Sequence, residues 1–121
     1  IEANVRKLRS KLKNNCEFMA VVKADGYGHD AKVVSENAIK GGASQLGVAT
    51  LKEGIKLRSF GINVPILVLG NLYTKKDLLV CFKNDLSHNA IKSMRASINA
   101  SPLISPFVHR FKSRFELFTF S

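Results

Sequence analysis

Short apolar runs alternate with amphipathic segments along most of this sequence, and this order constrains the fold more than any other feature. The runs have the length of strands and cover residues 18–23, 46–49 and 64–69. Segments with helical spacing of their apolar residues surround them and cover residues 3–14, 31–40, 51–60 and 75–84. Strands that alternate with helices across short connections predict an α/β fold with a parallel sheet and crossover helices.

The number of strands leaves the architecture of this sheet open. Three parallel strands do not close a barrel, and an open doubly wound sheet fits the same pattern. The runs are continuously apolar, as in sheets that are covered on both faces.

Polar residues mark where three of the helices should begin. Asp30 is placed as an N-cap for the helix over residues 31–40. The next two helices are each preceded by the spacing of a capping box, in Thr50 with Glu53 and in Thr74 with Asp77. We expect the helix over residues 51–60 to bury Leu51, Ile55 and Leu57.

The first apolar run ends in Lys23, and a loop with two glycines, Tyr27 and His29 follows. A lysine at the end of a buried strand is partly desolvated, which favours the neutral amine that attacks a carbonyl. Most lysines at strand ends extend into water, so Lys23 taken alone is a weak candidate for a catalytic group. Asp25 is suited to accept hydrogen bonds from amides of the loop.

Composition argues against several kinds of partner. The net charge is +10, but residues 1–86 hold 14 Lys and Arg against 8 Asp and Glu, spread along the segment. We find no nucleic-acid-binding motif and no apolar stretch long enough to cross a bilayer, so we expect neither partner. Cys16 and Cys81 lack metal-ligand spacing, so we expect no metal; they suggest a reducing compartment and a cytoplasmic protein.

The alternating pattern ends near residue 86, so we divide the chain into a folded part, residues 1–86, and an atypical tail, residues 87–121. The tail holds seven serines and five of the eight phenylalanines, four of which recur at helical spacing between basic residues. This spacing fits a basic aromatic surface for a membrane or nucleic acid. It also fits a helical packing patch or a disordered segment with no selected fold, and we favour these two interpretations over a binding surface.

Residues 20–29, AVVKADGYGH, closely resemble the pyridoxal-phosphate attachment segment of alanine racemases. Further blocks follow in the order of that family: Gly42-Ala43, Leu46–Thr50, Glu53–Ile55, Leu57-Arg58, Gly61-Ile62 and Pro65–Gly70. The resemblance covers about residues 1–86.

The resemblance implies a (β/α)₈ TIM-type barrel, of which this chain would form an incomplete part with the first three strand–helix units. A mainly β domain would follow, and the enzyme would be a homodimer that interconverts L- and D-alanine for peptidoglycan. Lys23 matches the lysine that holds pyridoxal 5′-phosphate as an internal aldimine and serves as one of two acid–base groups. Tyr27 matches a tyrosine that reaches the cofactor phosphate, and Leu69 matches a residue that packs near the cofactor.

The chain also departs from this family. It has no counterpart of the opposite-face tyrosine or of the arginine that faces the pyridine nitrogen, both of which lie further along a full-length racemase. The chain begins with Ile1, so we expect it to be processed, trimmed or a fragment. Residues 87–121 do not resemble the family's fourth strand and beyond, and one of the two acid–base groups is missing, so we expect an N-terminal fragment that is inactive alone. Two alternatives stay open: a non-racemising pyridoxal-phosphate barrel protein, and a basic binding module that acts through its aromatic tail.

Overall fold

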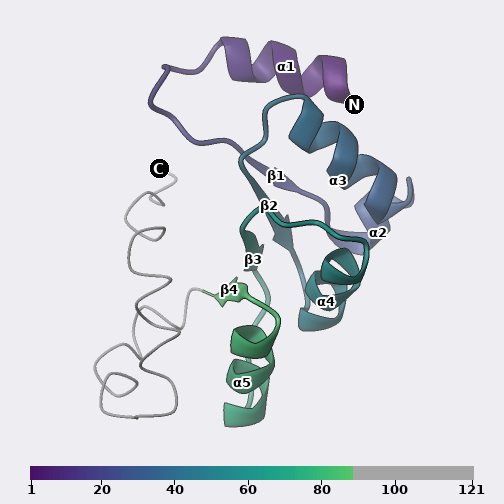
Figure 1. The fold of residues 1–121 in the computed structure, drawn as a ribbon, viewed down its shortest axis with the longest axis vertical. Coiled ribbons are helices and arrows are strands. Elements are labelled where there is room, and N and C mark those ends of the chain that lie inside the picture. The colour runs from purple at the N-terminus through teal and green to yellow at the C-terminus, as the bar shows by residue number, and fades with distance from the viewer. Residues whose placement is uncertain (89–121) are drawn as a thin grey trace. The chain divides into compact units, whose positions relative to one another are not determined.

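Four parallel strands alternate with helices in the part of the chain that the computed structural model describes, residues 1–88 (Figure 1). The helices are α1 (Glu2–Ser10), α2 (Lys23–Tyr27), α3 (Ala31–Lys40), α4 (Leu51–Ser59) and α5 (Lys75–Lys83). The strands are β1 (Met19–Val21), β2 (Gln45–Val48), β3 (Ile66–Val68) and β4 (Leu86–His88). The predicted aromatic helix of the tail lies outside the described residues.

The sheet has the order β1-β2-β3-β4, and every neighbouring pair is parallel. Leu46 of β2 is level with Ile66 of β3, and Ile66 is level with Leu86 of β4. This arrangement confirms the predicted α/β fold with a parallel sheet. Among the described strands the order does not reverse, so each strand lies beside the next one in the sequence.

The fourth strand corrects the prediction of three. β4 begins at Leu86, the last residue of the predicted folded part, and places Ser87 level with Leu67 and His88 level with Val68 of β3. The sequence Leu-Ser-His contains one strongly apolar residue and therefore gives no apolar run. Its pairing with β3 and the burial of Leu86 at 0% exposure make it a strand in the fold.

The core lies between the sheet and helices α3, α4 and α5, which cover the same side of the strands (Figure 1). Alternate positions of the strands, and Val22 directly after β1, supply side chains that are at most 2% exposed, namely Val22, Leu46, Val48, Ile66, Val68 and Leu86. The helices contribute Ala38, Leu57 and Cys81 to the same cluster. Burial of these apolar side chains away from water is the main favourable contribution to the folding of residues 1–88.

Helix starts follow the predicted caps. The side chain of Asp30 accepts from the backbone amides of Lys32 and Val33 at the start of α3. Both predicted capping boxes are also present, in Thr50 with Glu53 before α4 and in Thr74 with Asp77 before α5.

The predicted inner face of α4 is wrong at one position. Ile55 is 37% exposed, whereas Gly54 and Leu57 are buried. A Cβ atom at Gly54 would lie 2.9 Å from a methyl group of Leu86, so the missing side chain lets α4 approach β4 closely. Apolar spacing alone does not show which glycine forms such a contact.

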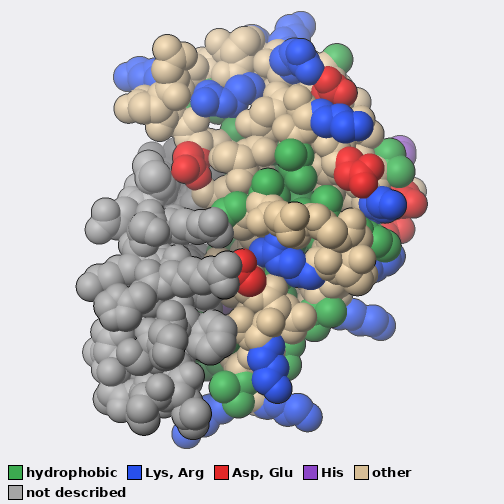
Figure 2. All heavy atoms as spheres, in the orientation of Figure 1, with side chains coloured by type: hydrophobic (Ala, Val, Ile, Leu, Met, Phe, Trp, Pro, Cys, Tyr) green, Lys and Arg blue, Asp and Glu red, His purple; other side chains and the backbone are tan. Residues whose placement is uncertain are grey.

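Basic side chains are distributed around the face of the molecule seen in Figure 2 and do not gather in one patch there. Within residues 1–88, no helix has both the length and the apolar character that a membrane crossing requires. In the same residues, no group of three His, Cys, Asp or Glu side chains is arranged to hold a metal ion.

Candidate functional site

The C-terminal ends of the parallel strands form one edge of the sheet, and the three predicted site residues lie along it. Lys23 and Tyr27 follow β1, and Leu69 directly follows β3. Ligands of parallel α/β folds bind at this edge, where the loops after the strands meet. The fold therefore places residues that are 46 positions apart in the sequence, Lys23 and Leu69, at the same edge of the sheet.

Lys23 leaves the sheet earlier than predicted. β1 ends at Val21, and the amide of Val22 still donates to the Gly47 carbonyl at 2.8 Å, so the ladder extends one residue further. Val22 is 2% exposed, whereas Lys23 is exposed. The predicted partial desolvation of this lysine is not found in this chain, because the backbone turns outward directly after Val22.

Residues 23–28, here called the Lys23 turn, have left-handed backbone angles from Ala24 onward. The φ and ψ angles are 52° and 51° at Ala24, 54° and 42° at Asp25, and 67° and 36° at Gly26; φ is 57° at Tyr27. The Gly26 amide donates to the Val22 carbonyl, and the Gly28 amide donates to the Ala24 carbonyl. Left-handed helical geometry costs about 1–2 kcal/mol for each residue with a side chain, so surrounding contacts must stabilise the turn.

Two glycines have different tasks in this turn. Gly26 is buried, and a Cβ atom there would lie 2.8 Å from a methyl group of Val34 on α3. Gly28 has a φ of 82° and open space where its side chain would be. Gly26 is therefore required for packing as well as for its backbone angle, and Gly28 only for its angle.

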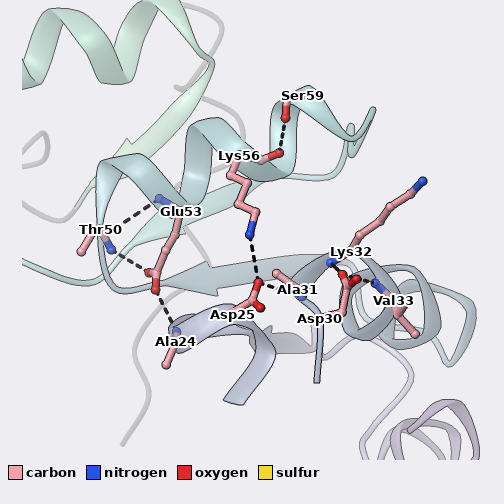
Figure 3. A network of polar contacts seen from close by, with 10 residues as sticks. All are labelled: Ala24, Asp25, Asp30, Ala31, Lys32, Val33, Thr50, Glu53, Lys56 and Ser59. Atoms are coloured by element: carbon pink, nitrogen blue, oxygen red, sulfur yellow. Dashed lines mark hydrogen bonds and ion pairs between the residues drawn. The ribbon is translucent and has the colours of Figure 1, made fainter. Parts of the chain in front are cut away.

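The carboxylate of Glu53 connects the Lys23 turn to the loop after β2 (Figure 3). One oxygen accepts from the amide of Ala24 at 2.8 Å. The other accepts from the amides of Ala49 and Thr50 at 2.8 and 3.0 Å. The capping-box spacing predicts the bond to Thr50, but no signal in the sequence indicates the bond to Ala24, 29 residues away.

Asp25 provides a second connection between the Lys23 turn and its surroundings (Figure 3). Its carboxylate pairs with the Lys56 ammonium of α4 at 3.1 Å and accepts from the Ala31 amide at 3.3 Å. The hydrogen bond from Lys56, followed by that from Ala31, holds the pKa of the Asp25 carboxyl below its ordinary value. The predicted loop-shaping role of Asp25 agrees with these contacts.

Tyr27 and Leu69 present different surfaces at the same edge. Tyr27 is 60% exposed at the end of α2. Leu69 is 40% exposed, and its amide donates to the Val48 carbonyl at 2.7 Å. A Cβ atom at Gly47 would lie 3.4 Å from side-chain atoms of both Leu69 and Val21, so these side chains meet over the glycine. They form a small apolar surface beside the strand that leads to Lys23.

His88 is a further residue of this edge that the sequence does not reveal, because the strand that carries it is not predicted. Its Nε2 atom lies 2.6 Å from the carbonyl oxygen of Gly70. The side chain thereby links the end of β4 to the loop after β3, and it is 7% exposed.

Comparisons with known proteins give one consistent result. Residues 1–96 match the family described as alanine racemase, N-terminal domain. The alanine racemase of Prochlorococcus marinus is 56% identical over 86 residues, which are 71% of this chain and 22% of that protein. The alanine racemase of Nostoc sp. is 51% identical over 75 residues, which are 62% of this chain and 19% of that protein.

Solved structures with the same fold carry the same name. Alanine racemase from E. faecalis superposes with a TM-score of 0.69 at 39% identity, over 72% of this chain and 23% of that one. Alanine racemase from Bacillus anthracis with bound L-Ala-P has a TM-score of 0.69 at 39% identity, over 72% of this chain and 22% of that one. The chain thus spans about 22% of the length of the first curated relative it matches.

Proposed function

This chain belongs to the alanine racemase family, whose N-terminal domain it matches, and we therefore propose that it forms the N-terminal part of an enzyme that interconverts L- and D-alanine with pyridoxal 5′-phosphate. One observation carries the proposal. A left-handed turn, bonded to Glu53 and Lys56 of α4, carries the exposed Lys23 at the C-terminal edge of a parallel sheet, where ligands of such folds bind.

The residues at this edge suit pyridoxal phosphate chemically. A primary amine, such as that of Lys23, forms a covalent bond with an aldehyde carbon. A phenol, such as that of Tyr27, donates a hydrogen bond to a phosphate oxygen. The surface of Leu69 and Val21 over Gly47 offers apolar contact to a planar ring. An amine, a phenol and an apolar surface at one edge of the sheet are together compatible with the binding of pyridoxal phosphate.

Lys23 would have two successive tasks in the reaction. Its Nζ atom would first bind the cofactor covalently and be released when the amine of alanine takes its place. Bound pyridoxal phosphate supplies an electron sink that makes the Cα hydrogen of the amino acid acidic. The free Nζ atom would then take up or return that proton on one face of Cα.

Tyr27 and Leu69 would orient the cofactor. Tyr27 lies four residues after Lys23 on the same turn, so a bond from its hydroxyl to the phosphate would fix the far end of the cofactor relative to Lys23. Leu69, which is 40% exposed, would exclude water on the β3 side.

The sheet would be the first part of a (β/α)₈ barrel in the complete enzyme. Consecutive strands are neighbours, all are parallel, and α3, α4 and α5 cover one side, as in such a barrel. A doubly wound sheet instead reverses its strand order at a switch point and has helices on both faces.

The complete enzyme would be a homodimer in the cytoplasm.

Racemisation needs a second acid–base group on the opposite face of Cα. The sequence has no counterpart of the opposite-face tyrosine of the family, so we expect that the 121-residue chain by itself does not convert L- to D-alanine. With pyridoxal phosphate in deuterated water, we expect Cα–hydrogen exchange in one enantiomer at most, without inversion. Inversion that requires Lys23 would contradict this part of the proposal.

Titration of the 121-residue chain with pyridoxal phosphate tests cofactor binding. Covalent attachment to an amine changes the visible absorption of the cofactor. We expect a saturating change in the natural chain and in Lys52→Ala, which removes another exposed lysine at the same edge. Lys23→Ala should show no saturating change. An identical titration in all three proteins would contradict the proposal.

A further inference from the structure

We propose that Glu53 is a positioning residue for Lys23, because its carboxylate holds the left-handed turn that presents the Lys23 amine. The inference rests on the proposed function of Lys23 as the residue that binds the cofactor. Glu53 itself is not placed in contact with cofactor or substrate, and it would act through the backbone.

The bond from Ala24 to Glu53 restrains the peptide unit that leaves Lys23. The amide nitrogen of Ala24 is joined to the carbonyl carbon of Lys23, so a 2.8 Å bond to Glu53 orients this peptide plane. The other oxygen of Glu53 is fixed by the amides of Ala49 and Thr50. A single carboxylate thereby aligns the residues that follow β1 with those that follow β2.

Apolar packing alone does not hold the turn at this place. A partly open pocket of about 320 Å³ lies between the turn and α4, lined by Val22, Val48 and Leu57, with Asp25, Glu53 and Lys56 also in its wall. The connection through Asp25 and Lys56 is exposed, with 54% and 53% of the two side chains accessible, and exposed pairs contribute little. Glu53, which is half-buried, makes charge-assisted bonds to three amides and is the stronger connection.

The chain contains a natural control for this arrangement. Asp77 caps α5 as Glu53 caps α4, and its carboxylate accepts from the amides of Tyr73 and Thr74 at 3.0 Å each. Asp77 shows that an aspartate is long enough for the capping bonds. Glu53→Asp should therefore keep the cap of α4 but fail to reach Ala24, and Asp77→Glu is the matched change in the other cap.

Amide hydrogen exchange measured by NMR on the 121-residue chain tests the contact. In Glu53→Asp, we expect exchange at Ala24 to accelerate about tenfold or more, with Thr50 still protected, because a hydrogen bond to a charged group is lost. Asp77→Glu should leave exchange at Ala24 unchanged. Equal exchange at Ala24 in Glu53→Asp and the natural chain would overturn the inference.

The rate of pyridoxal phosphate attachment at Lys23 tests the consequence for the site. We expect it to fall about tenfold in Glu53→Asp and to stay unchanged in Asp77→Glu, at a temperature where all three proteins are folded. A purely structural role would give both variants the same rate. An unchanged rate in Glu53→Asp would overturn this inference alone, whereas no attachment at Lys23 in the natural chain would overturn the proposed function.

Discussion

The guanidinium of Arg58 donates to the carbonyl oxygen of Asp85 at 2.8 Å and thereby ties the end of α4 to the residue before β4. The same side chain donates to the carbonyls of Ile62, Val64 and Asn84, and 16% of it is accessible. α4 therefore connects the segments at both ends of the parallel strands. Glu53 at its start bonds to the loops after β1 and β2, and Arg58 near its end bonds to the segments before β3 and β4.

Replacing Arg58 should destabilise the whole unit. Arg58→Lys keeps the charge but cannot reach four carbonyls from one planar group. We expect the free energy of unfolding, measured with urea, to fall by about 3 kcal/mol, since partly buried carbonyl acceptors lose a charged donor. Arg6→Lys, at an exposed position of α1, should change it by no more than about 0.5 kcal/mol. Similar losses in both variants would argue against this role.

Alanine substitutions at the two glycines of the Lys23 turn separate the cost of backbone strain from the cost of a steric clash. Gly28→Ala should cost about 1 kcal/mol, because only its positive φ is unfavourable for alanine. Gly26→Ala should cost about 3 kcal/mol, because its Cβ would also collide with the stiff side chain of Val34. Urea denaturation of the two variants measures the difference. Equal costs would show that Gly26 does not pack against α3 as described.

Two aspartates should make the fold sensitive to acid. The pKa of Asp25 lies below its ordinary value of 3.8, mainly because of the hydrogen bond from Lys56. The pKa of Asp77 lies below 3.8, mainly because of the hydrogen bond from the Tyr73 amide. Both values are lower in the folded chain, so the stabilisation is present above 3.8 and is lost as the pH falls through the folded pKa values.

Urea midpoints measured from about pH 5 down to about pH 2 test this dependence. The midpoint should fall with pH in the natural chain. Asp25→Asn and Asp77→Asn should each show a smaller fall, because one titrating group with a lowered pKa is removed. If neither variant changes the slope, the contacts described for these carboxylates do not persist in solution.

The two cysteines should differ in reactivity. Burial, and then the charge of Asp77, raise the pKa of the Cys81 thiol to about 11, and the residue is 0% exposed. The reactive thiolate is therefore rare at about pH 8. Iodoacetamide should modify the half-buried Cys16 first, as followed by mass spectrometry, and both equally in concentrated urea. Equal rates in the folded chain would contradict the burial of Cys81.

Much of this fold could be predicted because its signals are local. The cap of α3 at Asp30 and the capping boxes before α4 and α5 depend on residues two to four positions apart. The resemblance to alanine racemases also depends on contiguous residues, and the family match confirms it. Local hydrogen bonds and apolar periodicity appear directly in the sequence.

The remaining features depend on contacts between distant residues. The residue composition of β4 does not indicate a strand, although its residues are buried as in a strand. Leu86 is buried because it packs against Gly54 of α4, which is distant in the sequence. The bond from Ala24 to Glu53 joins residues 29 positions apart, and neither residue type indicates it. The left-handed geometry of Ala24 and Asp25 is also hidden, since these residues rarely adopt it without such support.

Reduction of the pyridoxal phosphate complex with borohydride, followed by peptide mass spectrometry, tests the central claim most directly. Reduction makes the bond between cofactor and lysine permanent, so the modified residue is identified by mass. With one equivalent of cofactor on the 121-residue chain, we expect the label on Lys23 and none above background in Lys23→Ala. A label spread evenly over exposed lysines such as Lys52 and Lys75, and unchanged in Lys23→Ala, would contradict it.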